Sequence, residues 1–221
     1  YGRDHEAGVE AARLGHRLIA QELKSIGVDG DFTPVLDTPI SGADPIIGDR
    51  ALGKDAKTIV ALGAAALQGL HAGGVAGCIK HMPGHGRAET DSHLALPRVL
   101  ASAQELETDI APFASLAWAE AAMTAHIVYE AWDPDRPATC SAKVINEIIR
   151  GRLGFHGLLM SDDLDMKALQ YALNGGLAQR AMAALEAGVD VVLQCSGVLK
   201  DMEDVVDGCG ELDGISLVRA R

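Results

Sequence analysis

The feature that most constrains the fold is an alternation of amphipathic helices with short apolar strands, which occurs five times along the chain. The strands lack the apolar/polar alternation of a half-exposed sheet. Strands that are apolar on both faces and alternate with helices are typical of a parallel sheet covered by helices. Three expected helices lie at about 5–26, 56–71 and 104–118; a fourth begins at Ser141 and a fifth ends at Gly188. Expected strands lie at 31–37, 75–79, 121–128 and 189–195, and one more begins at Leu158.

Each expected strand ends in polar residues. An open doubly wound sheet concentrates its site at one switch point, whereas a closed (β/α)8 barrel gathers residues from many strand ends around one mouth. The distribution therefore favours an α/β fold with a (β/α)8 TIM-like barrel. The strand-end residues are Asp37, Lys80 and His81, His126, Asp162 and Asp163, and Gln194 and Cys195.

The length of the chain limits how much of such a barrel it can form. A barrel of this type has eight strands and typically ~250 residues, whereas the pattern gives five strand units in 221 residues. Unpaired strand edges can pair with other chains and lead to aggregation, so an open five-stranded sheet of this kind is unfavourable. We therefore predict that residues 1–221 form a single barrel domain that holds the last five strand units, incomplete at the amino end, with the missing strands preceding Tyr1 in a longer native chain.

Composition excludes several classes of partner. The net charge of −12 and the absence of a Lys/Arg run argue against nucleic acid or an anionic membrane as the main partner. No apolar stretch reaches the length of a membrane span. The cysteines form no C-x-x-C pair, which predicts small buried side chains in a reducing compartment; they are Cys78, Cys140, Cys195 and Cys209.

The densest polar motif is Lys80-His81-Met82-Pro83-Gly84-His85-Gly86, followed by Asp91-Ser92-His93. It directly follows an apolar strand, so that Lys80 and His81 leave the carboxyl end, where parallel α/β folds bind ligands. These groups could instead be ordinary strand-end polar residues. They could also be read as zinc ligands, but the proline and glycine break the helix that a paired-histidine zinc motif needs. We expect His85 to organise the loop and His126 to line a pocket or the core.

A second motif, Ser161-Asp162-Asp163-Leu164-Asp165-Met166, follows the strand that begins near Leu158. Three carboxylates in close succession repel one another, so they are kept at a strand end only with a partner or a task. Ser161, Asp162 and Asp163 are also good N-caps for a helix starting near Leu164. Both explanations can hold, with one Asp capping while another does chemistry.

These two motifs resemble signatures of glycoside hydrolase family 3, in its bacterial β-N-acetylglucosaminidase branch. Met82 stands where Phe is more usual. Three further segments resemble other blocks of that branch, in the same order; they are Asp31-Phe32-Thr33-Pro34-Val35-Leu36-Asp37, Ile47-Gly48-Asp49-Arg50 and Met123-Thr124-Ala125-His126. The resemblance covers essentially the whole chain.

The resemblance implies a role for six residues. Asp162 matches the family's nucleophile, and His93 matches the general acid/base, with Asp91 as its partner. Arg50, Lys80 and His81 match positions that bind the sugar carrying the 2-acetamido group. No cofactor and no metal are implied, and the family suggests a monomer or weak dimer. The residue types fit this chemistry, because retaining hydrolysis needs a carboxylate and a proton donor, and a hydrogen bond to Asp91 would fix the tautomer of His93.

The function that the resemblance implies is a cytoplasmic, retaining β-N-acetylglucosaminidase. It would release GlcNAc from GlcNAc-anhydroMurNAc during bacterial peptidoglycan recycling, through a covalent glycosyl-enzyme. Two alternatives stay open. A phosphorylase would keep Asp162 but use phosphate as the acceptor, and a degenerate barrel would only bind sugars or partners.

Overall fold

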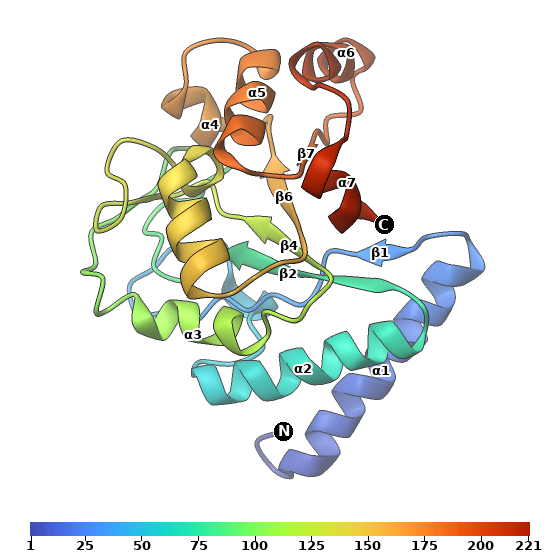
Figure 1. Cartoon of the computed structure of the whole chain (residues 1–221). Helices are drawn as coiled ribbons and strands as arrows, with labels where there is room; N and C mark the ends of the chain where they lie inside the picture. Colours follow the sequence, from blue (N-terminus) through green and yellow to red (C-terminus); the bar gives the residue numbers. More distant parts are fainter.

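The computed structural model describes all residues from 1 to 221, and its centre is one parallel sheet of five strands in the order β1-β2-β4-β6-β7 (Figure 1). The sheet is curled and open, as part of the wall of a (β/α)8 barrel would be. The expected fold class is therefore confirmed. The strands are β1 (Gly30–Asp31), β2 (Ala76–Met82), β4 (Ala121–Thr124), β6 (Leu158–Asp163) and β7 (Val191–Leu193).

Helices cover the outer side of this sheet. The helical segments are α1 (His5–Ser25), α2 (Ala56–Ala72), α3 (Glu107–Ser115), α4 (Lys167–Ala172), α5 (Leu177–Ala187), α6 (Leu199–Gly208), α7 (Gly214–Ala220), a π-helix η3 (Val144–Arg152), and the short turns η1 (Gly48–Arg50) and η2 (Ala138–Cys140). The carboxylates of Asp4 and Asp55 cap α1 and α2 by accepting backbone N–H bonds at 3.0 Å. Helices α1 and α2 pack closely, since a Cβ at Gly69 would lie 2.2 Å from the carbonyl oxygen of Arg13.

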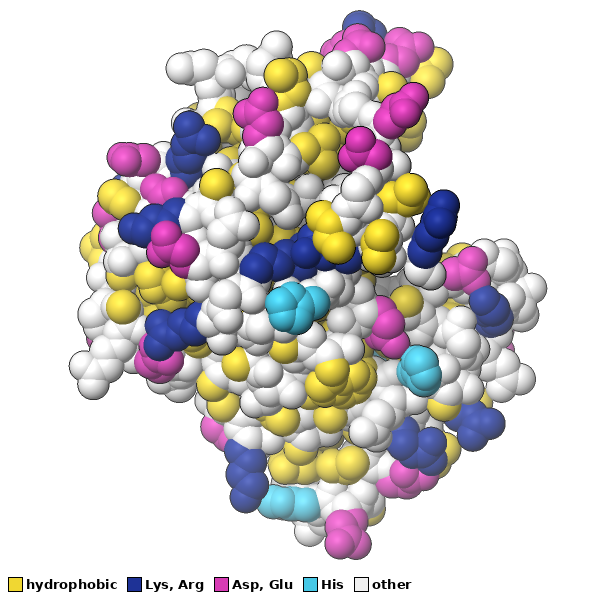
Figure 2. Space-filling model, in the orientation of Figure 1, with side chains coloured by type: hydrophobic (Ala, Val, Ile, Leu, Met, Phe, Trp, Pro, Cys, Tyr) yellow, Lys and Arg dark blue, Asp and Glu magenta, His cyan; other side chains and the backbone are white.

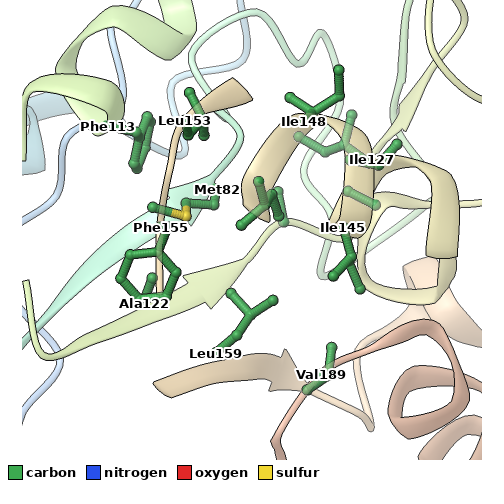
Figure 3. Close-up of a cluster of buried hydrophobic side chains, with 14 of the residues drawn as sticks. Met82, Phe113, Ala122, Ile127, Ile145, Ile148, Leu153, Phe155, Leu159 and Val189 are labelled. Atoms are coloured by element: carbon green, nitrogen blue, oxygen red, sulfur yellow. The ribbon is translucent and has the colours of Figure 1, made fainter. Parts of the chain in front are cut away.

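Successive strand residues point to opposite faces of the sheet and belong to two separate apolar clusters, as expected for a sheet buried on both faces. Ile79, Ala122 and Leu159 face the helices and join the main core, which Figure 3 shows between the sheet and η3. Their neighbours Cys78, Ala121 and Met160 form a second cluster on the opposite, inner face. Continuing this alternation past Cys78 and Met160 turns Lys80 and Asp162 toward the inner face.

Several expected boundaries were wrong. The strand predicted at 75–79 extends to Met82, and the helix predicted from about Leu164 begins at Lys167. The single strand predicted at 121–128 is two strands, because β5 (Val128–Tyr129) leaves the sheet to pair with β3 (Arg98–Val99). The first strand is also shorter than the expected 31–37, although Val35 still bridges to Lys80.

The cysteine prediction holds in part. Cys78 and Cys140 are buried, whereas Cys195 lies beyond the end of β7 and is exposed, and Cys209 is half-buried. All four thiols are free. On the face seen in Figure 2, Lys and Arg side chains lie among Asp and Glu side chains and hydrophobic patches. None of the helices combines the length and the apolar composition that crossing a membrane requires.

Candidate active site

A pocket of about 160 Å³ lies at the carboxyl ends of β2, β4 and β6. It gathers five of the six candidate site residues, since the sixth, Asp91, is absent from its lining. A regular strand would turn Lys80 and His81 to opposite faces, but the pairing register shifts between Lys80 and Met82, and both side chains line the pocket. The full lining is Phe32, Ile46, Arg50, Lys80, His81, His85, Ser92, His93, Met123, Asp162, Leu193 and Cys195.

Asp162 projects into this pocket near the end of β6. Its Oδ1 accepts a hydrogen bond from the backbone N–H of Asp163 at 2.8 Å, and its Oδ2 lies 3.9 Å from Nε2 of His81. Burial would raise the pKa of Asp162, but the charges of His126 and His81, with the Asp163 N–H, outweigh it and lower the pKa. The side chain keeps 22% of its surface exposed. Asp162 is therefore an ionised carboxylate that a ligand can reach.

His81 is held by a fully buried carboxylate, that of Asp37. The Nδ1–H of His81 donates to Oδ2 of Asp37 at 2.7 Å, and the backbone N–H of His85 donates to Oδ1 at 2.7 Å. Burial raises the pKa of Asp37, while the charge and hydrogen bond of His81 and the His85 N–H lower it more. Because Nδ1 donates to Asp37, Nε2 is the ring nitrogen left to face the pocket.

Asp91 and His93 form a hydrogen-bonded pair on the loop after β2. Oδ1 of Asp91 accepts from both the backbone N–H and Nδ1 of His93, each at 2.8 Å. Burial raises the pKa of Asp91, but these two bonds lower it more, so the carboxylate stays ionised. The imidazole of His93 is 58% exposed and lines the pocket, with Asp91 behind it. The geometry leaves Nε2 of His93 free to exchange a proton with a bound molecule.

Arg50 closes the pocket from the turn η1. Its guanidinium donates to the carbonyl oxygen of Ile46 at 2.6 and 3.1 Å, which fixes the side chain and leaves further N–H groups for a ligand. Together with Lys80 it gives the pocket several hydrogen-bond donors. Such donors suit the hydroxyl and amide oxygens of a sugar.

Several residues behave as the sequence indicated. His126 is buried with both ring nitrogens bonded, to Oγ1 of Thr139 at 2.7 Å and the carbonyl oxygen of Asp163 at 3.0 Å. Both ring nitrogens therefore have hydrogen-bond partners, so His126 is a structural residue and has no free nitrogen to act as a base. Oδ1 of Asp163 accepts backbone N–H bonds from Asp165 and Cys195 and so holds the loops beside the pocket.

The sequence analysis missed one supporting contact in the site, the one between Asp37 and His81. The hydrogen bond by which Asp37 supports His81 was not predicted, because the two residues lie 44 positions apart. Its only hint was the place of Asp37 at an expected strand end. No group of three or more His, Cys, Asp or Glu side chains is arranged to hold a metal ion.

The comparisons with known proteins agree with this arrangement. Residues 4–214 match the family described as "Glycosyl hydrolase family 3 N terminal domain". The chain belongs to glycosyl hydrolase family 3. It is 42% identical over 198 residues to a beta-hexosaminidase of Thioalkalivibrio sulfidiphilus and 44% identical over 202 residues to one of Alkalilimnicola ehrlichii. Each match covers 89% of this chain but 56% of the relative, so the chain spans about half the length of these family members.

Solved structures of the family share the fold. NagZ from Neisseria gonorrhoeae, solved in complex with N-trifluoroacetyl-D-glucosamine, superposes with a TM-score of 0.85 at 38% identity, over 96% of this chain and 61% of that one. A family 3 beta-N-acetylglucosaminidase from Paenibacillus gives a TM-score of 0.84 at 36% identity, over 93% of this chain and 38% of that one. The curled sheet is therefore part of the barrel of family 3.

Proposed function

We propose that the protein carrying this chain is a retaining β-N-acetylglucosaminidase. The observation that supports this most directly is the meeting in one pocket of an ionised carboxylate from a strand end, Asp162, and an imidazole from a separate loop, His93, with a carboxylate behind it. Retaining glycosidases need a nucleophile and a proton donor on two sides of the scissile bond. The family membership supports the proposal that Asp162 is the nucleophile and His93 the proton donor.

In the first step, Asp162 attacks the anomeric carbon of GlcNAc as the bond to the glycosidic oxygen breaks. The imidazolium of His93 gives its Nε2 proton to that oxygen, so that the aglycone leaves as an alcohol. Asp91 holds the other ring nitrogen and stabilises the charged ring before the transfer. The product is a glycosyl ester on Asp162 and a neutral His93.

In the second step, the neutral Nε2 of His93 takes a proton from water as the water oxygen attacks the anomeric carbon. The ester bond to Asp162 breaks, the carboxylate returns, and GlcNAc leaves with its original β configuration. Arg50 and Lys80 bind the sugar through their N–H groups, and His81 contacts it through Nε2. Lys80 and His81 also face Asp162, whose returning charge they stabilise.

The proposal includes a specific substrate and place of action. We assign the substrate as GlcNAc-anhydroMurNAc from peptidoglycan recycling, and the location as the cytoplasm, where that recycling takes place. The support is the resemblance to the bacterial branch of the family and the similarity to NagZ of Neisseria gonorrhoeae.

The test is an assay of leaving-group dependence. The unchanged protein should release β-GlcNAc from both a nitrophenyl glycoside and GlcNAc-anhydroMurNAc, with retention visible by proton NMR. His93→Ala should lose roughly 10²-fold or more in kcat on the muropeptide. The loss should be far smaller on the nitrophenyl glycoside, since nitrophenolate leaves without a full proton.

Two results would overturn the proposal. Release of GlcNAc-1-phosphate in phosphate buffer, in place of free GlcNAc, would make the protein a phosphorylase. Equal losses on both substrates in His93→Ala would move the acid/base role to another residue.

A further inference from the structure

Ser92 lies between the two members of the Asp91–His93 pair, yet its surroundings differ from theirs. Ser92 is 2% exposed, whereas the side chains of Asp91 and His93 are 22% and 58% exposed. Its hydroxyl lies 3.1 Å from Nε2 of His85, and its carbonyl oxygen accepts the backbone N–H of Ala168 at 3.2 Å. Ser92 is thus the point at which this part of the loop is fixed to the body of the protein.

His85 is itself fixed to the buried Asp37–His81 pair, which we call the Asp37–His81 platform. Its backbone N–H donates to Asp37, and its ring packs edge-on against the ring of His81 at 5.5 Å between centroids. The ring is buried, and Nδ1 has no hydrogen-bond partner. The only polar contact of the His85 ring is therefore the one with Ser92.

The internal bonds of the Asp91–His93 pair do not fix its distance from Asp162. Both bonds join residues two positions apart, so the pair could move as a unit with its geometry intact. The earlier part of the loop is held separately, by the ion pair of Arg87 with Asp109 and by the backbone bond from Asp44 to Ala88. What connects the pair to the Asp37–His81 platform is the contact between His85 and Ser92.

We propose that His85 is a positioning residue, which holds the loop of the Asp91–His93 pair over the pocket through the hydrogen bond between its ring and the Ser92 hydroxyl. This inference rests on the proposed function. Its chemistry requires His93 Nε2 to reach the glycosidic oxygen, and small displacements of a catalytic group are costly in rate. His85 acts through Ser92 and takes no part in proton transfer.

The test compares Ser92→Ala, His85→Asn and His85→Gln. An asparagine amide reaches about as far as Nδ1 of His85, whereas a glutamine amide reaches the place of Nε2 and can still bond the Ser92 hydroxyl. Amide hydrogen exchange over residues 87–97 should be roughly two- to ten-fold faster in Ser92→Ala and His85→Asn, the factor that one neutral hydrogen bond supplies. His85→Gln should stay close to the unchanged protein.

Kinetics supply the second readout. Ser92→Ala and His85→Asn should lower kcat on the muropeptide by a similar two- to ten-fold factor, with a smaller effect on nitrophenyl GlcNAc and on KM. The control is Ser25→Ala, which removes an exposed hydroxyl bond of 2.7 Å at the end of α1, far along the chain from this loop. It should change neither exchange over 87–97 nor kcat.

Three results would overturn the proposal. Equal effects of His85→Asn and His85→Gln would show that the ring only fills space. Unchanged exchange in Ser92→Ala would show that the bond does not hold the loop, and faster exchange with unchanged kcat on the muropeptide would show that the loop needs no such hold. Failure of the unchanged protein to release GlcNAc would overturn the proposed function instead, and the exchange experiment would still decide whether the bond holds the loop.

Discussion

At the scale of single residues, two adjacent carboxylates have different surroundings. Asp163 uses Oδ1 to accept backbone N–H bonds from Asp165 and Cys195, so its carboxylate holds loops together. Asp162 receives one backbone bond, on Oδ1, and its Oδ2 faces His81 across 3.9 Å with room for a ligand. The nucleophile of the proposed reaction is therefore Asp162, and Asp163 supports the pocket.

Substitution of the two carboxylates should separate these roles. Asp162→Ala should lower kcat by on the order of 10³-fold or more while a GlcNAc analogue still binds, because a nucleophile acts mainly in the transition state. Asp163→Ala should cost about ten-fold, as a loss of support. Steady-state kinetics measures both, and a fluorinated GlcNAc should leave a covalent adduct on the peptide holding Asp162. Comparable losses from both variants, or an adduct elsewhere, would contradict the assignment.

The residues that line the pocket could be predicted from the sequence better than their hydrogen-bond partners could. Asp91 and His93 lie two positions apart, so their pairing could be expected from local geometry. The support of His81 by Asp37 joins residues 44 positions apart, and the bond from His85 to Ser92 depends on how the loop folds back. Such contacts follow from tertiary structure, and no periodicity or motif encodes them.

At the scale of helices and strands, the alternation of helices with apolar segments predicted the sheet but not the residues at which its strands end. The apolar run from Ala121 to Val128 predicted one strand, because apolarity does not say which neighbour a strand pairs with. After Thr124 the chain leaves the main sheet, and Val128 pairs with Arg98 in a separate two-stranded sheet. The extension of β2 through His81 was also hidden, since polar residues at a strand end look like the start of a loop.

One buried carboxylate, Asp190, joins several elements and should be important for stability. It precedes β7 and accepts bonds from the backbone N–H of Leu159 at 2.9 Å, from Arg150 at 2.7 Å, and from Ser216 and Arg219 at 2.7 and 2.9 Å. Asp190→Ala would remove this acceptor from two partly buried guanidinium groups, a hydroxyl and a backbone N–H. We expect it to lower the free energy of unfolding by about 3–5 kcal/mol.

Chemical denaturation measures this effect, with Lys200→Ala as the control. Lys200 pairs with Asp204 on an exposed face of α6, and such exposed pairs contribute little to stability. The control should therefore unfold almost as the unchanged protein does. A loss below about 1 kcal/mol in Asp190→Ala would show that the elements do not depend on this carboxylate.

At the scale of the whole molecule, buried titratable groups are concentrated at the carboxyl end of the sheet. His85 and His126 are almost fully buried there, close to the carboxylates of Asp37 and Asp162. Burial lowers the pKa of both histidines below the ordinary 6.5, and the nearby carboxylates only partly oppose this. The same region that forms the pocket therefore makes the stability of the protein depend on pH.

The free energy of unfolding should fall as the pH drops below about 6.5. In this range the unfolded chain protonates the two histidines more readily than the folded protein does, because their pKa values are lowered on folding, so the unfolded state binds more protons and is favoured. Each ring contributes up to about 1.4 kcal/mol per pH unit. A further loss should begin below about pH 4, because the pKa values of Asp37 and Asp162 are lowered in the folded state from the ordinary 3.8.

Urea denaturation at pH 7.5, 6.0 and 5.0 checks this dependence. His126→Asn should be less stable at pH 7.5 but should lose less on acidification, since one of the two buried rings is gone. His156→Gln, which replaces an exposed histidine, should keep the full slope. If His126→Asn kept that slope too, or if stability were constant from pH 7.5 to 5.0, the buried rings would not be the groups that link folding to protonation.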